Sequence, residues 1–319
     1  MADIVDYEFG ISAIDSGFLR PHYDAVHLIV ESGRAALVDT AHNDAVPRVL
    51  EALAAKELGP EDVDFVIVTH IHLDHAGGAG LLMRHLPNAR LAVHPRGARH
   101  MADPARLVAS TIEVYGEAAA RRMYGEVVPV DPSRIIQTQD GTILRLNGRE
   151  LLFVDTPGHA PHHQCIVDRK SGHAFTGDTY GVCYRQLGTE DRQFVWPVTP
   201  PSQFDPEALH RSIDRVASHG PGAIYLTHFG QLRDVPRLAS DLHRLIDAHV
   251  EVGRRAVAAG VDRHERMVAD LRRVALTEAE RYHWPVSSEQ VLQVLSHEFD
   301  LNAKGVALWL DRVTPKRSG

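Results

Sequence analysis

The most constraining feature of this sequence is an apolar run that ends in a dense group of metal-ligating side chains. Residues 63–68 (VDFVIV) are typical of a strand buried on both faces. The segment THIHLDHAGG follows directly and places His70, His72, Asp74 and His75 within six positions. Side chains two positions apart on an extended chain point to the same side, and the acidic residue and last histidine lie in the following turn. The sequence therefore predicts a metal site at the carboxyl end of this strand.

Three later strand-like segments also end in a side chain that can bind a metal. They are TPGH, which ends at His159, FTGD, which ends at Asp178, and YLTH, which ends at His228. The chain holds 21 histidines in 319 residues, more than a fold needs, and histidine is the commonest metal ligand. A single histidine at a strand end is more often structural. Together with the first motif, however, these positions form a set.

The rest of the chain divides into a strand-rich part and a helical part. Short strands are expected in the first 40 residues and again between residues 135 and 176, and the segment from Pro104 to Arg122 is expected to be helical. After Gly230 the sequence predicts only helices, with one long helix over residues 244–259. Capping-box patterns begin at Thr277 and Ser287, and each predicts a helix start.

Two short sequences recur in the same order in both halves of the strand-rich part. LVDT at residues 37–40 is matched by FVDT at 153–156, and VIVTH at 66–70 is matched by IYLTH at 224–228. Chance explains echoes of this length easily. If they are more than chance, they indicate two similar β-rich halves whose central strands converge on a single site.

Charge and composition exclude several classes of partner. The chain has 34 basic and 42 acidic residues, a formal charge of −8, so neither nucleic acid nor an anionic membrane surface is an expected partner. The first residues lack the pattern of a secretory signal, and no apolar stretch approaches the roughly 20 residues that span a bilayer. We therefore expect a cytoplasmic protein that acts on a small molecule. The sequence leaves a homodimer open.

The motif His70-x-His72-x-Asp74-His75, followed in order by the three later ligands, resembles that of the metallo-β-lactamase superfamily of binuclear metallohydrolases. The resemblance covers about residues 4–232. It implies an α/β fold, the four-layer αβ/βα sandwich, with a catalytic domain over residues 1–232. Residues 233–319 would then be a helical C-terminal extension that acts as a substrate lid, a dimerisation surface or a plain stabilising appendage.

The resemblance also implies a role for each metal ligand. One ion would be held by His70, His72 and His159, and the other by Asp74, His75 and His228, with Asp178 bridging the two. Zinc is the expected ion, with iron or manganese as alternatives. Two divalent cations that share a water lower its pKa toward neutrality, which supplies a hydroxide nucleophile without a serine or cysteine.

Further residues are expected to support this chemistry. Asp74 is placed to shuttle a proton. Asp39 and Asp155, both at strand ends, either orient ligand histidines or only cap turns. Tyr180 resembles a lactonase tyrosine near the bridging aspartate, although the spacing is one residue short. Its phenol would donate to a developing oxyanion, or would be an ordinary core tyrosine.

The expected substrate is a small ester, thioester or lactone. TPGHAPHH at residues 156–163 and FTGDT at residues 175–179 resemble segments of glyoxalase II thioesterases and lactonases. GVCYR at residues 181–185 departs from the Gly-Cys-Gly-Arg run that contacts glutathione in glyoxalase II. The candidate substrate-binding residues are Tyr180, His162, His163, Tyr184, Arg185 and Trp196.

Two other reaction classes of the superfamily remain as alternatives. Flavodiiron-type oxygen reductases resemble this scaffold but carry Glu where this chain has His72, and imidazole suits iron less well than a carboxylate does. Persulfide dioxygenases keep the first motif and use a single iron. A phosphodiesterase or nuclease of the same superfamily is the other alternative. The acidic balance and the absence of an insertion rich in lysine and arginine count against a nuclease.

Overall fold

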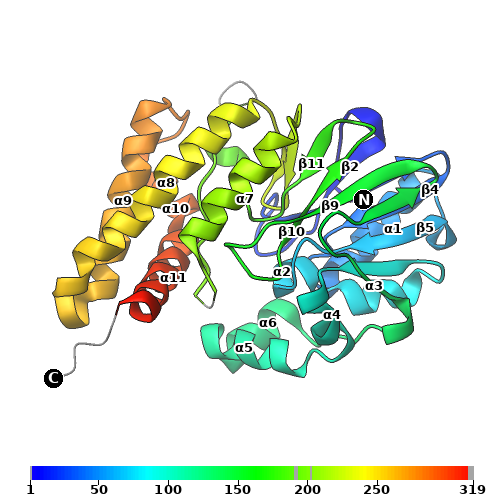
Figure 1. The fold of residues 1–319 in the computed structure, drawn as a ribbon, viewed down its shortest axis with the longest axis horizontal. Coiled ribbons are helices and arrows are strands. Elements are labelled where there is room, and N and C mark those ends of the chain that lie inside the picture. Colours follow the sequence, from blue (N-terminus) through cyan, green and yellow to red (C-terminus); the bar gives the residue numbers. More distant parts are fainter. Residues whose placement is uncertain (1, 190–192, 202, 315–319) are drawn as a thin grey trace.

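Thirteen strands of the described part of the chain form two facing sheets, shown as arrows in Figure 1. The computed structural model describes residues 2–189, 193–201 and 203–314. The first sheet has the order β1-β2-β3-β4-β5-β6-β7, antiparallel from β1 to β4 and parallel from β4 to β7. Its strands are β1 (Ile4–Asp6), β2 (Ile11–Asp15), β3 (Ala25–Glu31), β4 (Arg34–Val38), β5 (Val63–Ile67), β6 (Arg90–Val93) and β7 (Ile135–Gln137).

The second sheet has the order β13-β12-β11-β10-β9-β8. All its strand pairs are antiparallel except β11 with β12, which run parallel. Its strands are β8 (Ile143–Leu146), β9 (Arg149–Asp155), β10 (Gln164–Asp168), β11 (His173–Phe175), β12 (Ile224–Leu226) and β13 (Gly230–Leu232). The strands β5 and β12, which carry the echoed VIVTH and IYLTH sequences, therefore lie in different sheets.

Helices cover the outer face of each sheet, and the apolar core has three corresponding parts. Ile67, Phe153 and Phe175 belong to the core between the sheets. A second cluster joins the first sheet to α1, α3 and α4, and a third joins the second sheet to α7 and α8. The α-helices are α1 (Val46–Ala55), α2 (Leu73–Ala76), α3 (Ala79–His85), α4 (Pro95–Ala102), α5 (Ala105–Tyr115), α6 (Glu117–Tyr124), α7 (Pro206–Ser218), α8 (Val235–Ala256), α9 (Arg263–Arg281), α10 (Ser288–Val294) and α11 (Ser296–Val313). The expected four-layer αβ/βα sandwich is confirmed.

The predicted helical C-terminal region is confirmed from Val235 onward, after the short strand β13, and it shares its core with the second sheet. α8 to α11 pack together beside α7 (Figure 1). One buried cluster contains Ile213 of α7, Leu242 of α8 and Phe299 of α11. The expected boundary at residue 233 falls between β13 and α8. Among the described residues, no helix is both long and apolar enough to cross a bilayer.

The structure corrects three helix boundaries. The segment from Pro104 to Arg122 is two helices, because Gly116 has a φ of 80° that ends α5 before α6 begins. The long helix α8 begins at Val235 rather than at Arg244. Thr277 lies inside α9, where its hydroxyl donates to the carbonyl of Arg273, so the helix start expected there is wrong. The capping box of Ser287 is confirmed at the start of α10.

Candidate metal centre

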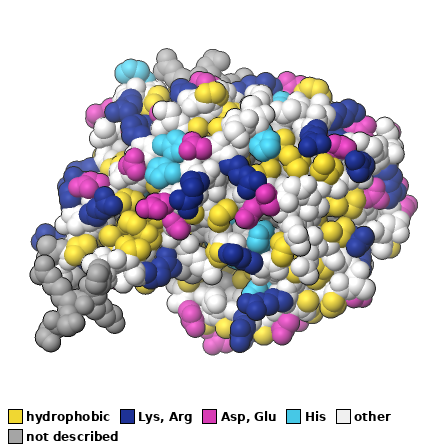
Figure 2. All heavy atoms as spheres, in the orientation of Figure 1, with side chains coloured by type: hydrophobic (Ala, Val, Ile, Leu, Met, Phe, Trp, Pro, Cys, Tyr) yellow, Lys and Arg dark blue, Asp and Glu magenta, His cyan; other side chains and the backbone are white. Residues whose placement is uncertain are grey.

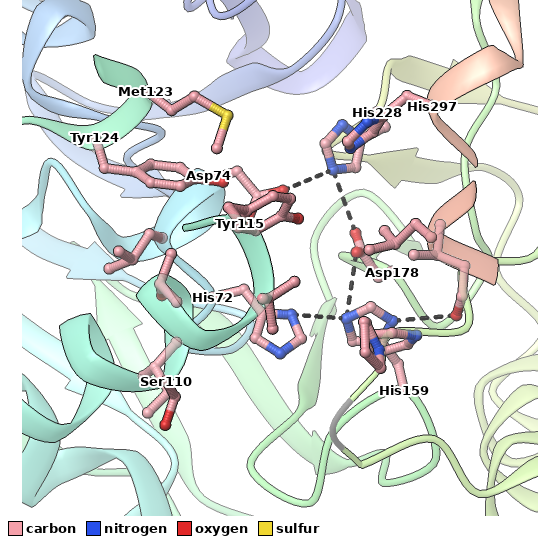
Figure 3. Close-up of a pocket in the computed structure, with 18 of the residues that line it drawn as sticks. His72, Asp74, Ser110, Tyr115, Met123, Tyr124, His159, Asp178, His228 and His297 are labelled. Carbon is pink, nitrogen blue, oxygen red and sulfur yellow. Dashed lines mark hydrogen bonds and ion pairs between the residues drawn. The ribbon is translucent and has the colours of Figure 1, made fainter. Parts of the chain in front are cut away.

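The candidate ligands follow strand ends of both sheets. Asp74 and His75 lie in the short helix α2, and the other five lie in loops. β5 ends at Ile67, three residues before His70, and β12 ends at Leu226, two residues before His228. β9 and β11 similarly precede His159 and Asp178. Because the sheets face each other, these strand ends bring ligands from distant parts of the sequence to one place. Figure 3 shows His72, Asp74, His159, Asp178 and His228 around the same pocket.

The first trio consists of His70, His72 and His159. His72 Nδ1 lies 2.9 Å from His70 Nε2 and 3.0 Å from His159 Nε2. All three nitrogens lie within 4.8 Å of one another, a spacing that allows them to share one metal ion. Burial lowers the pKa of His72 to about 3 and lowers the pKa of His70 well below its ordinary value. Both rings are therefore neutral at pH 7 and offer lone pairs to a cation.

The second trio consists of Asp74, His75 and His228, whose ligand atoms also lie within 4.8 Å of one another. Asp74 Oδ2 is 3.7 Å from His75 Nε2 and 3.5 Å from His228 Nε2. Burial by itself lowers the pKa of His228, but Asp178 and Asp74 raise it to about 9. In the absence of a metal these carboxylates thus favour positive charge on the imidazole, as they would favour a bound cation.

Asp178 lies between the two trios. Its Oδ1 is 3.2 Å from His75 Nε2, and its Oδ2 is 3.4 Å from His159 Nε2. Its two oxygens therefore face ligands of different trios. His75 Nε2 and Asp178 Oδ1 are buried, and although they lie 3.2 Å apart, neither makes a well-aligned hydrogen bond among the described residues. Buried polar atoms rarely stay unsatisfied, and five imidazoles with two carboxylates suit zinc or a similar divalent ion. The residues present therefore fit a pair of metal ions.

Hydrogen bonds to the remaining ring nitrogens fix how these histidines are oriented. Asp39 Oδ2 lies 2.8 Å from His75 Nδ1, and Asp39 also accepts hydrogen bonds from Thr69 and Thr227. His228 Nδ1 donates to the carbonyl of Tyr23 at 3.0 Å. Such contacts set the tautomer of a ligand and increase its basicity. Asp39 therefore has the orienting position that the sequence suggested.

His159 is also held through its second ring nitrogen, whereas Asp155 lies away from the candidate ligands. His159 Nδ1 donates to the carbonyl of Val198 at 3.3 Å. Asp155 contacts no candidate ligand in the described structure; its carboxylate instead lies 3.1 Å from Nε2 of His94. An orienting role for Asp155 is therefore wrong.

Five of the candidate ligands line a cavity of about 350 Å³: His72, Asp74, His159, Asp178 and His228. Its walls come from the loop before β3, from α5 and α6, from the loop after β11 and from α11. Of the candidate substrate residues, His162 and Tyr184 line this cavity. The others do not: Tyr180, His163, Arg185 and Trp196 lie outside its wall.

Local packing explains why these four side chains do not reach the cavity. Tyr180 is buried, and its hydroxyl donates to the carbonyl of Ile213. Trp196 packs against His249 and Phe299. Neither the oxyanion-donor role expected for Tyr180 nor substrate contact by Trp196 agrees with these positions.

His163 and Arg185 also lie outside the cavity wall, each for a different reason. His163 is buried behind the ligands, where its Nε2 accepts a hydrogen bond from the backbone amide of Asp178. Arg185 is exposed and lies over the ring of Phe229. His163 thus supports the backbone at Asp178 and does not face the cavity.

Several residues that line the cavity belong to none of the sequence motifs described above. Tyr115 and Tyr124 come from α5 and α6, and Glu298 comes from α11. Glu298 is buried and accepts a hydrogen bond from the hydroxyl of Tyr184. Tyr184 in turn stacks on Tyr23, with ring centroids 5.3 Å apart. Only the folded chain brings these residues near the metal centre, so short sequence motifs could not have found them.

Comparison with known proteins gives a family and a fold. A family model described as the metallo-beta-lactamase superfamily matches residues 20–228. The solved structure of an archaeal metallo-beta-lactamase superfamily protein, ST1585 from Sulfolobus tokodaii, superposes with a TM-score of 0.65 at 19% identity. That superposition covers 93% of this chain and 98% of the other, and it shows a shared fold.

The curated relatives include enzymes. The hydroxyacylglutathione hydrolase of Salmonella typhi is 28% identical over 167 residues, which cover 51% of this chain and 51% of that enzyme. The acyl-coenzyme A thioesterase MBLAC2 of Gallus gallus is 30% identical over 179 residues, which cover 48% of this chain and 61% of that enzyme. The chain therefore spans about half to three fifths of the length of these relatives.

Proposed function

Because the chain belongs to the metallo-beta-lactamase superfamily, we propose that it is a metal-dependent hydrolase of a small ester, thioester or lactone. The observation that carries this proposal is the position of Asp178 between two ligand trios at the wall of a cavity. His70, His72 and His159 would hold one divalent ion, and Asp74, His75 and His228 would hold the second. Zinc is the proposed ion, with iron or manganese as alternatives.

Two metal ions bound there would supply Lewis-acid activation of a water and of the scissile carbonyl. The chain itself would orient the ligands and handle the proton. Asp39, Val198 and Tyr23 fix the ligand rings through their second nitrogens. The Asp74 side chain is 24% exposed and lines the cavity, so its carboxylate can receive a proton from an attacking water and deliver it to the leaving group.

The apolar side chains in the cavity wall support an apolar acyl group as the part of the substrate that the site selects. Leu107, Val114, Met123 and Leu301 line it, contributed by α5, α6 and α11. Apolar walls with a few polar groups are typical of small-molecule sites, because the walls supply affinity and the polar groups supply orientation. We propose that the acyl chain of the substrate lies against these residues and that its carbonyl lies at the two ligand trios, where the metal ions would be held.

A substrate panel tests this proposal. Metal-loaded protein would be assayed with acyl-coenzyme A thioesters of increasing chain length, aryl esters, lactones and a phosphodiester. We expect hydrolysis of a carbon ester or thioester, with kcat/KM rising with acyl length, and loss of this turnover in Asp178→Ala. A Leu107→Asp variant should keep turnover of the shortest substrate and lose the preference for longer ones.

The same panel separates the alternatives. Hydrolysis of the phosphodiester alone would assign the site to phosphodiester chemistry. Oxygen uptake with glutathione persulfide by protein holding one iron, without hydrolysis, would instead assign it to iron-dependent oxidation.

A further inference from the structure

A second group of imidazoles lies outside the catalytic cavity, where α7 meets α8. His210 of α7 and His243 of α8 have their Nδ1 atoms 2.6 Å apart, and their rings stack at 18° with centroids 4.9 Å apart. Figure 2 shows histidine side chains beside acidic ones on the face formed by these helices. We propose that this pair binds one divalent transition-metal ion such as Zn²⁺, at a site distinct from the catalytic centre.

The sequence repeats the same pattern on both helices. α7 contains HRSID at residues 210–214 and α8 contains HRLID at residues 243–247, so each helix places an aspartate one turn after its histidine. Each histidine pairs with the aspartate of the other helix. His210 Nε2 is 3.2 Å from Asp247 Oδ1, and His243 Nε2 is 2.9 Å from Asp214 Oδ1.

These pairings decide which ring nitrogens carry hydrogen. An ionised carboxylate only accepts hydrogen bonds, so Nε2 is the protonated nitrogen in both rings. A neutral imidazole has one N–H, and both Nδ1 atoms therefore present lone pairs to each other. Two lone pairs at this distance repel unless a positive charge lies between them. The arrangement thus requires a cation, either a proton or a metal ion.

The surroundings favour a metal ion over a proton. Histidines that bind metals almost always donate their other N–H to a carboxylate or carbonyl, and here both do so. Asp214 and Asp247 add two negative charges next to the pair, which favours a dication. The His210 and His243 side chains are 26% and 28% exposed, so water can complete the coordination. Zinc bonds of about 2.0–2.1 Å in a tetrahedron need the nitrogens about 3.3 Å apart, which a small rotation of these half-buried rings would supply.

Such an ion would join the two parts of the chain. His210 lies in the region up to residue 232, and His243 lies in the helical extension. None of the four residues lines the catalytic cavity. A metal ion bridging α7 and α8 would therefore hold the extension, including the α11 residues that close the cavity, against the sheet domain without taking part in catalysis.

Zinc binding to the full-length protein, with its catalytic metals already loaded, tests the site. The wild type should bind one more equivalent of Zn²⁺ per chain than either His210→Gln or His243→Gln, as measured by competition with a chromogenic chelator. The double variant should lose no further equivalent. Asp247→Asn should weaken this extra equivalent by about 10- to 100-fold. Added Zn²⁺ should raise the midpoint of thermal unfolding of the wild type but not that of His210→Gln.

The matched control is His264→Gln, which removes a surface histidine that pairs with Asp300 but has no second imidazole facing it in the described structure. This variant should retain the extra equivalent, and all variants should retain hydrolytic activity. The proposal is overturned if His210→Gln and His243→Gln bind as much Zn²⁺ as the wild type, or if His264→Gln loses the same equivalent. A pair that titrates with pH in NMR spectra but does not respond to Zn²⁺ would show a shared proton and would also overturn it.

Discussion

For single residues, the grouping of the candidate metal ligands could be predicted because four of them lie within six positions of the sequence and the others follow strand ends. His70, His72, Asp74 and His75 have spacing that fixes their relative positions almost locally. The direction in which a side chain points was harder to predict. Tyr180 is two residues from Asp178, yet it turns toward Ile213, because sequence proximity does not determine which way a side chain points out of a loop.

Asp39 makes a residue-scale prediction, since it bonds His75, Thr69 and Thr227 simultaneously. Both carboxylate oxygens of Asp39 take part in these hydrogen bonds, whereas asparagine has a single acceptor oxygen. In Asp39→Asn, His75 therefore loses the contact that orients its ring. We expect metal affinity to fall by about 10- to 100-fold, measured by competition with a chelator. Asp155→Asn is the control, because Asp155 pairs with His94, and it should bind metal as the wild type does. Equal losses in both variants would show that Asp39 has no special role.

At the scale of elements, the sequence predicted strands and helices well where local signals are strong and poorly where tertiary contacts decide. The capping box at Ser287 starts α10, whereas the same pattern at Thr277 lies inside α9. Packing of α9 against α8 and α11 continues the helix through that position. No local pattern could reveal that α11 closes the cavity or that its polar residues hold a distant loop.

That loop is held by Asn302 of α11, which is buried. Its Oδ1 accepts from the Thr199 amide at 2.9 Å and its Nδ2 donates to the Pro197 carbonyl at 2.7 Å, on either side of the Val198 carbonyl that accepts from His159. Asn302→Leu leaves both backbone groups buried without partners. We expect the free energy of unfolding to fall by about 2–4 kcal/mol in urea titrations.

The activity of Asn302→Leu should also fall, because His159 loses a fixed partner. Lys304→Ala on the same helix removes only an exposed ion pair with Asp300 and should change the free energy of unfolding by less than about 0.5 kcal/mol. An Asn302→Leu variant as stable as Lys304→Ala would contradict the role assigned to this contact.

At the scale of the whole molecule, the resemblance implied the sandwich, and the structure adds how the two sheets meet. His27 of β3 lies between them, with its ring 5.5 Å from Phe175 and 5.6 Å from Tyr225. Burial lowers the pKa of His27 from 6.5 to about 4. In the unfolded chain His27 has its ordinary pKa and binds a proton more readily than in the folded chain. The free energy of unfolding is therefore undiminished by this group above pH 6.5, and it falls as the pH drops from 6.5 toward 4.

A His27→Leu variant isolates this effect from other titrations. Between pH 7 and pH 5 the wild type should lose about 2 kcal/mol more of its free energy of unfolding than the variant does. Denaturant titrations of both proteins at each pH measure the difference. If the free energy of unfolding changed equally with pH in both proteins, His27 would not be the source of the pH-dependent loss.

We have proposed that the two ligand trios, with Asp178 between them, form one hydrolytic centre that would hold two metal ions. Its most direct test is a titration of metal-free protein with Zn²⁺ while hydrolysis of the best acyl substrate is followed. Activity should rise until two equivalents per chain have been bound at the centre, and Asp178→Ala should stay inactive throughout. Hydrolysis by the metal-free protein, or full activity at one equivalent, would contradict the claim.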